Sequence, residues 1–154
     1  MLNLSGLPPY WTPFNIFDLR NAETFNTLFD IAHQVLLRMP QPVAMVCGPI
    51  TSGGLGSREK NLEVFRKTIK SLSDNGIIVF SQMPFEEPMW RIQKKIEATL
   101  YYKEGGSILE SFYLPIFESG LVKKFYFIPG WETSMGATWE HSQAKIMGIE
   151  IMYL

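Results

Sequence analysis

The sequence is almost without cysteine and histidine. Among its 154 residues, Cys47 is the one cysteine, and His33 and His141 are the two histidines. One cysteine excludes a disulfide within the chain, and its place in an apolar run is typical of core packing. Two histidines without a cysteine cluster do not form the pattern of a zinc site, and no Ser-His-Asp or Cys-His arrangement can be assigned. We therefore expect no bound metal.

Excess charge and long apolar runs are absent as well. The formal net charge is −1, so the chain lacks the basic field on which non-specific nucleic-acid binding depends. No uncharged stretch approaches the ~20 residues that cross a bilayer, and the first residues have neither a basic n-region nor a long apolar h-region. These absences predict a cytoplasmic protein that binds neither a nucleic-acid polymer nor a membrane.

Apolar residues are plentiful enough, at 46%, for one globular core. Residues 1–20 are rich in proline and aromatic rings without a period, and we expect an irregular arm. Residues 21–39 carry apolar side chains at helical spacing, with Asn21 as the expected N-cap and Pro40 beyond the end. Residues 1–40 are therefore predicted to form an aromatic arm and a helix, packed on a domain formed by residues 41–154.

Short apolar runs alternate with helical patterns in the rest of the chain. Strands are expected at VAMVC (43–47), IIVFSQMP (77–84), KKFYFIP (123–129) and IEIMY (149–153). Helices are expected over 58–76, within 85–105, over 107–121 with an interruption near Pro115, and after Ser134. This order predicts an α/β fold with an open, doubly wound, mostly parallel sheet of the flavodoxin or Rossmann-like kind, and an N-terminal helical extension.

Ligands bind such sheets at the carboxyl ends of the strands. We therefore expect a site among loops 48–57, 82–88 and 130–135. The loop GPITSGGLGS (48–57) is neither a Walker loop nor a dinucleotide fingerprint, so it does not predict ATP or NAD. It still allows the backbone to approach a ligand, with Thr51, Ser52 and Arg58 as candidate donors.

The loop GWETSMG (130–136) precedes the last helix. Thr133 or Ser134 is the expected N-cap, and free N–H groups near Gly136 are suited to an anion, although ordinary capping uses the same residues. Trp131 offers a flat face on which a base could stack, or it packs on the core.

Glu140 is the anomaly of the last helix. On a helical wheel it lies within an apolar arc formed by Met135, Ala137, Trp139, Ala144, Ile146 and Met147. A carboxylate on such a face costs several kcal/mol unless it is paired, hydrogen-bonded or open to a cleft. Two alternatives remain open: a bond to a neighbouring element, or a role as nucleophile or general base. His141 is expected to face the solvent, so we expect no Glu-His dyad.

The segments MVCGPIT, GIIVFSQMP and PGWETSMGATWEHSQAKIMGIEI, with Asn61 and Phe65 on the helix between the first two, resemble the nucleoside 2-deoxyribosyltransferase-like superfamily. Within it they are most similar to a branch of small proteins with the motif Pro-Gly-Trp-Glu-x-Ser-x-Gly-Ala-x-x-Glu-His. The resemblance covers roughly residues 42–154.

The resemblance implies that Glu140 is a nucleophile. It would attack C1′ of a nucleoside or nucleotide, release the base and form a glycosyl-enzyme intermediate that water or a second base resolves. By the same match, Gly48 and Pro49 line the sugar pocket, Asn61 and Trp131 contact the substrate, and Ser134 with the N–H groups near Gly136 holds a 5′-phosphate. The resemblance also implies a homo-oligomer and no cofactor.

The chain departs from the superfamily at the supporting acids. An aspartate usual before the third strand is replaced by Lys123-Lys124, and Glu118 is the nearest acid upstream. Glu86 and Glu87 are the candidates to protonate the leaving base, unless they are simply exposed loop acids.

These residues favour an enzyme that acts on the N-glycosidic bond of a nucleoside or nucleoside 5′-monophosphate, by hydrolysis or by transfer. The alternative is a non-catalytic nucleotide-binding or interaction module that has lost part of the acid set. A third possibility is a vestigial cleft, with the aromatic arm as a surface for a partner.

Overall fold

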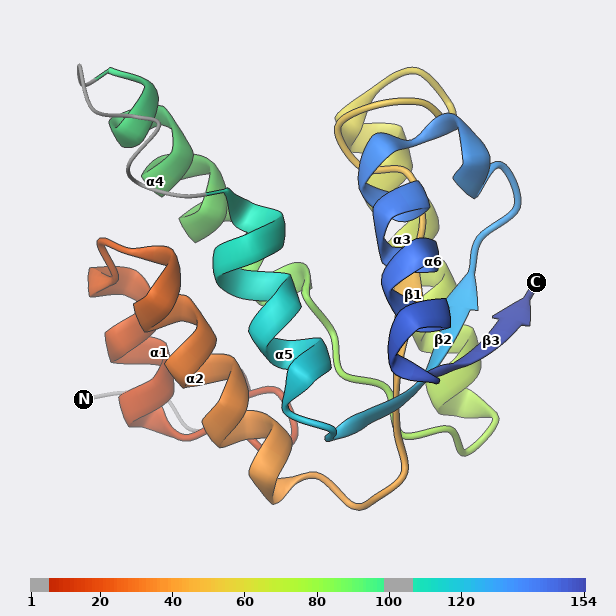
Figure 1. Ribbon diagram of the computed structural model, residues 1–154. Helices are drawn as coiled ribbons and strands as arrows, with labels where there is room; N and C mark the ends of the chain where they lie inside the picture. Colours follow the sequence, from red (N-terminus) through yellow and green to blue (C-terminus); the bar gives the residue numbers. More distant parts are fainter. Residues whose placement is uncertain (1–5, 99–106) are drawn as a thin grey trace. The chain divides into compact units, whose positions relative to one another are not determined.

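The computed structural model describes residues 6–98 and 107–154 (Figure 1). The chain forms two compact units, one of Met1–Met39 with Pro84–Ile116 and the other of Pro40–Met83 with Phe117–Leu154. A segment from the middle of the sequence thus joins the N-terminal residues. The predicted division of the chain at residue 40 stays a prediction, and the two units are described separately.

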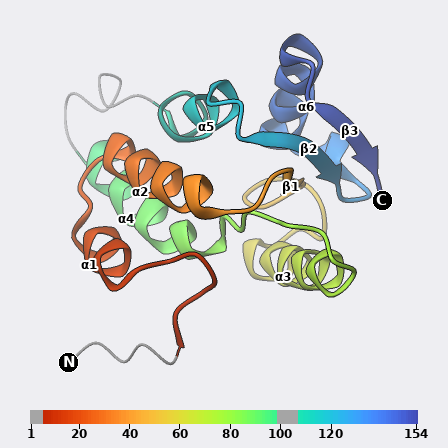
Figure 2. The same cartoon turned by 90° about the horizontal axis from the view of Figure 1, so that it is seen from below.

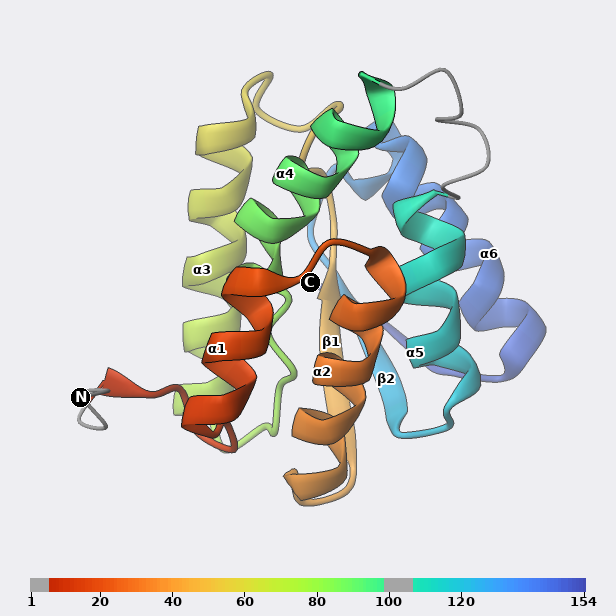
Figure 3. The same ribbon diagram turned by 90° about the vertical axis from the view of Figure 1, so that its left-hand side faces the viewer.

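The first unit is helical (Figure 3). Its elements are α1 (Pro13–Asn21), α2 (Phe25–Arg38), α4 (Glu86–Glu97) and the π-helical turn η4 (Leu109–Tyr113), which leads into α5 (Leu114–Glu118). The last two residues of α5 already belong to the second unit, which begins again at Phe117. Phe85 anchors the aromatic part of its core, with ring centroids 5.4 Å from Trp11 and 5.0 Å from Phe112. No helix in the described ranges is both long enough and apolar enough to span a membrane.

The prediction of an irregular arm over residues 1–20 is wrong from residue 13 onward, where α1 forms. Thr12 caps this helix. Its Oγ1 accepts from the Asn15 N–H at 3.2 Å, and its own N–H donates to Asn15 Oδ1 at 3.1 Å. Pro13 occupies the first helical turn, where a missing N–H is harmless. Asn21 therefore ends α1, and Thr24 caps α2 in its place by accepting from the Thr27 N–H at 3.1 Å.

The interruption expected near Pro115 takes the form of a π-helical turn directly before it. The Leu114 N–H donates to the Leu109 carbonyl, five residues back, and α5 continues through Pro115. Proline cannot donate to the carbonyl four residues earlier, and a wider turn accommodates that loss without ending the helix.

The second unit contains a parallel sheet in the order β1 (Val43–Cys47), β2 (Val122–Phe127) and β3 (Glu150–Tyr153). Its crossover helices are α3 (Arg58–Asp74) and α6 (Met135–Met147). The strand expected at residues 77–84 is reduced to a single parallel bridge between Val79 and Ala44. The ladder stops there because the Gln82 side chain, not the next backbone N–H, donates to the Val46 carbonyl at 2.9 Å. The α/β fold is present, with this short bridge in place of the second strand.

Helices α3 and α6 cover opposite faces of the sheet (Figure 2). On one face, Ala44, Val46 and Tyr126 pack with Phe65 and Leu72 of α3. On the other face, α6 contributes Trp139 and His141 to a set of rings that includes Phe117, Phe125 and Phe127. The alternation of side chains along β1 and β2 therefore supplies two cores, one beneath each helix.

Replacing Asn15 by alanine tests the polar network of the first unit. Asn15 is buried, its Oδ1 accepts from Arg38 Nη1 at 2.8 Å, and its Nδ2 donates to Gln34 Oε1 at 2.9 Å. Asn15→Ala removes both bonds and takes this donor from Gln34 Oε1, although Arg38 Nη1 keeps its bond to the Tyr10 carbonyl at 3.0 Å, so the free energy of unfolding falls by about 1–3 kcal/mol. Chemical denaturation followed by circular dichroism measures the loss. Asn26→Ala, at an exposed position of α2, is the matched control; equal losses in the two variants contradict the role assigned to Asn15.

Candidate functional site

Parallel pairing places two loops at the same edge of the sheet. Cys47, the last residue of β1, pairs with Phe127, the last residue of β2. The next N–H, of Ile128, donates to the Cys47 carbonyl at 2.9 Å. The glycine-rich loop that begins at Gly48 and the loop that begins at Ile128 therefore start side by side.

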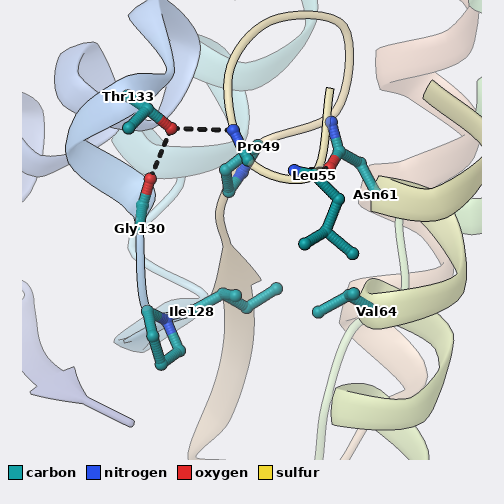
Figure 4. A pocket seen from close by; sticks show the side chains of 9 residues that line it. Pro49, Leu55, Asn61, Val64, Ile128, Gly130 and Thr133 are labelled. Carbon is teal, nitrogen blue, oxygen red and sulfur yellow. Dashed lines mark hydrogen bonds between the residues drawn. The ribbon is translucent and has the colours of Figure 1, made fainter. Parts of the chain in front are cut away.

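Thr133 and Asn61 fix the glycine-rich loop (Figure 4). Thr133 Oγ1 accepts from the Gly54 N–H at 2.8 Å and donates to the Gly130 carbonyl at 2.7 Å. Asn61 is buried in α3, where its Oδ1 accepts from the Leu55 N–H at 2.9 Å. Its amide Nδ2 donates to the Ile50 and Gly53 carbonyls at 3.0 and 3.2 Å. Thr133 was proposed from the sequence only as a possible N-cap, and its role as a bridge between loops was missed.

A pocket of about 180 Å³ lies between these loops, and we call it the edge pocket. Its lining residues are Pro49, Gly54, Leu55, Asn61, Val64, Ile128, Pro129, Gly130 and Thr133. Two predicted contacts, Pro49 and Asn61, thus lie in its wall. Gly48 stands just behind, where a Cβ atom would be 2.9 Å from the Ile128 Cβ. The walls are mostly apolar and no lysine or arginine lines them.

The other predicted binding residues are not brought into this lining. Thr51 is exposed on the loop, and Arg58 is the first residue of α3. Ser134 is the N-cap of α6, as one of the two candidates predicted, and is buried. Its Oγ accepts from the Ala137 N–H at 3.2 Å, and Gly136 lies in the first turn. The cap therefore uses the polar atom that was expected to hold a phosphate.

Glu140 is buried, as its place on the wheel predicted, with 8% of its surface exposed. The buried stripe of α6 is narrower than expected and consists of Ala137, Glu140 and Ala144. The prediction that Met135 and Ile146 lie on the buried arc is wrong, because 82% and 76% of their surfaces are exposed. Small alanine side chains let α6 approach the sheet closely, so bulky residues on the flanks of the stripe remain outside.

The Glu140 carboxyl group is held by the Cys47 thiol. The two side chains share a hydrogen bond, in which the thiol donates when the carboxyl is ionised. The Oε2 atom has no hydrogen-bond partner among the described residues. Burial raises the pKa of Glu140 to about 8, and the Cys47 bond offsets only part of that rise. Burial, with the nearby Glu140, also raises the pKa of Cys47. Of the two alternatives for Glu140, a bond to a neighbouring element is thus present.

Glu86 and Glu87 belong to the first unit and Glu140 to the second. Glu86 and Glu87 lie in the first turn of α4. Glu87 is exposed, and its Oε1 is 3.8 Å from Arg91 Nε. Their role as acids beside Glu140 stays a prediction. Lys123, where an aspartate was expected, is exposed on β2.

A second pocket lies on the other side of the Pro129-Gly130 turn, and we call it the aromatic pocket. It has a volume of about 540 Å³ and is lined by Phe127, Pro129, Gly130, Trp131, Glu132, Tyr153 and Leu154. His141, which was expected to face the solvent, is half-buried. Its ring stacks on Trp131 with centroids 4.3 Å apart, and its Nε2 is 2.6 Å from the Tyr153 hydroxyl. Glu140 lines neither pocket.

Comparison of the chain with protein-family models, with curated proteins and with solved structures finds no match. Within residues 6–98 and 107–154, no three side chains of the His, Cys, Asp or Glu type gather as metal ligands. The site at this end of the sheet is therefore described from its own residues: an apolar pocket fixed by Thr133 and Asn61, and the buried Glu140 carboxyl group of α6, which bonds to Cys47 at the end of β1.

The pH dependence of stability reports on Glu140. Its pKa rises from an ordinary 4.5 to about 8 on folding, so the folded chain binds the extra proton between these values. This stabilisation is complete below the ordinary value and is lost as the pH rises to about 8. The free energy of unfolding should fall by roughly 3–5 kcal/mol over that interval. Urea denaturation at a series of pH values measures the slope.

Glu140→Gln removes the titrating proton, so we expect most of that slope to disappear in this variant. Glu118→Gln, at an exposed acid of the same unit, keeps the slope. A slope that is equal in the wild type and in Glu140→Gln contradicts a raised pKa at Glu140.

Gly53→Ala and Gly56→Ala form a matched pair for the glycine-rich loop. Both residues have a positive φ, of +70° and +85°, so an added Cβ strains either backbone by about 1–2 kcal/mol. At Gly53 the Cβ also meets the main chain of Thr133, whereas at Gly56 it meets nothing within 4 Å. Gly53→Ala should therefore destabilise the chain by about 1–3 kcal/mol more than Gly56→Ala in thermal or urea unfolding. Equal effects contradict the close approach of the two loops.

Proposed function

We propose that the chain acts on the N-glycosidic bond of a nucleoside or nucleoside 5′-monophosphate, with Glu140 as nucleophile and with hydrolysis as the favoured outcome over transfer. The observation that carries this proposal is the contact of Glu140 with Cys47. Cys47 immediately precedes Gly48 and Pro49, and Pro49 lines the edge pocket. The Glu140 carboxyl group, whose Oε2 has no hydrogen-bond partner among the described residues, therefore lies at the end of the strand that leads into this pocket.

The proposed reaction needs the ionised form of Glu140. The carboxylate oxygen attacks C1′, the bond from C1′ to the base nitrogen breaks, and the base leaves with the electron pair and takes a proton from an acid. Water, or a second base in a transferase, then opens the glycosyl ester and releases Glu140. Because its pKa is raised to about 8, Glu140 reacts more readily as the pH rises toward that value.

The strand order supports a finer proposal, namely a doubly wound sheet of the flavodoxin or Rossmann-like kind. The bridge at Val79 lies on one edge of β1 and β2 lies on the other. The chain therefore changes direction between β1 and β2, and ligands of such folds bind at this point. The edge pocket lies there. A homo-oligomer and a cytoplasmic location remain part of the proposal, as the resemblance and the composition imply.

A second candidate is a nucleotide-binding or interaction module without catalysis. It is favoured by the absence of Glu140 from the lining of the edge pocket, and by Lys123 in place of the expected aspartate. In this alternative, buried Glu140 serves only to pack α6 on the sheet.

Incubation with deoxynucleosides and nucleoside 5′-monophosphates tests the proposal. We expect free base by chromatography, and a rate that increases up to about pH 8 because the ionised fraction of Glu140 increases. Glu140→Gln should lose at least about 10³-fold in rate, since an amide cannot form the glycosyl ester. Glu118→Gln is the matched control and keeps the rate. Base release that survives Glu140→Gln overturns the nucleophile, and binding without base release from any substrate favours the second candidate.

A further inference from the structure

The aromatic pocket is separate in its chemistry from the edge pocket. The two share only Pro129 and Gly130, and the edge pocket has no aromatic ring in its lining. The aromatic pocket has three: Phe127, Trp131 and Tyr153. The proposed N-glycosidic chemistry leaves this cavity without a role, apart from the stacking predicted for Trp131.

We propose that the aromatic pocket binds a small organic cation of the quaternary ammonium class. Aromatic rings have electron-rich faces, which attract a cation placed within about 6 Å of a ring centroid. The Trp131 and Tyr153 rings lie 6.2 Å apart with an angle of 21° between their planes, and the Phe127 centroid is 5.2 Å from that of Trp131. Phe127 is fully buried and packs beside Trp131, so Trp131 and Tyr153 are the two rings of the lining that expose surface to a ligand.

The charge of the lining selects the cation over an anion or a neutral ring. Glu132 is the one charged residue among the lining residues, and it is exposed. A carboxylate on the rim of an aromatic cavity attracts a positive ligand and repels a phosphate. A single carboxylate is too small a ligand set for a metal ion. A bulky ammonium group, which is weakly hydrated and needs no directed hydrogen bonds, fits both features.

His141 supports the rings from behind without opposing a cation. It covers one face of Trp131, so a ligand reaches the opposite face or the edge of the indole. Burial and nearby Lys145 lower the pKa of His141 below its ordinary 6.5, although Glu132 offsets part of this, so the ring is neutral at neutral pH. Lys145 is exposed on α6 and is not a lining residue.

Choline and its neutral isostere 3,3-dimethylbutan-1-ol separate the effect of charge from that of shape. We expect choline to bind saturably to the intact chain by calorimetry, with perturbation of the Trp131 indole N–H in NMR spectra. The isostere should bind about tenfold more weakly, because it keeps the volume and loses the charge. Adenine serves as the neutral flat ring. Equal binding of the isostere, tighter binding of adenine, or no saturable choline binding overturns the proposal.

Choline binding to substituted proteins tests whether the aromatic pocket is the binding site, without any measurement of catalysis. Trp131→Leu should abolish binding, and Glu132→Gln should weaken it about threefold to fivefold. Tyr153→Phe keeps the ring while it removes the bond to His141, so binding persists. Trp90→Leu removes an exposed indole in the other unit and leaves binding unchanged. Circular dichroism confirms that each variant is folded. Retention of choline binding by a folded Trp131→Leu protein overturns the site, whatever the outcome of the nucleoside assay.

Discussion

The parallel pairing of β1 with β2 is the constraint on which the sites depend. It aligns Cys47 with Phe127, so the loops that follow β1 and β2 leave the sheet at the same end and in the same direction. Two parallel strands cannot be joined by a tight turn, and each must be followed by a helix that returns the chain to the opposite edge. Right-handed crossovers on either side of β1 then place α3 and α6 on different faces. Both pockets and the contact between Glu140 and Cys47 follow from this one alignment.

The stability of the fold and the proposed reaction require opposite protonation states of Glu140. The stripe of Ala137, Glu140 and Ala144 lets α6 pack closely on the sheet, and close packing removes water from the carboxyl group. The resulting pKa of about 8 means that the proton stabilises the fold at neutral pH. A nucleophile requires the ionised group, which costs about 1.4 kcal/mol for each pH unit below the pKa. At neutral pH the close packing of α6 therefore lowers the fraction of ionised, reactive Glu140, unless a bound ligand with positive charge lowers the pKa again.

Sequence periodicity predicted those elements whose interactions are local or whose burial is complete. VAMVC became β1, residues 25–38 became α2, and Glu140 was placed on a buried face. Elements decided by a side chain acting on backbone were missed: the capping pair of Thr12 and Asn15 built α1, and Gln82 ended the expected strand. The Glu140 partner could not be predicted either, since Cys47 is 93 residues away and only the sheet register brings it to α6.

The Pro129-Gly130 turn is the wall that the two pockets share, and its rigidity keeps them distinct. Gly130 has a φ of +85°, and its carbonyl accepts both the Thr133 hydroxyl, at 2.7 Å, and the Thr133 N–H, at 3.1 Å. These bonds close the 3-10 turn Trp131–Thr133, so neighbouring side chains are directed to different cavities. Thr133 lines the edge pocket and Trp131 lines the aromatic pocket. The Thr133 side chain also bonds to the shared wall at Gly130, whereas the Trp131 side chain does not, so a change at Trp131 alters the aromatic pocket and leaves the bond between Thr133 and Gly130 in place.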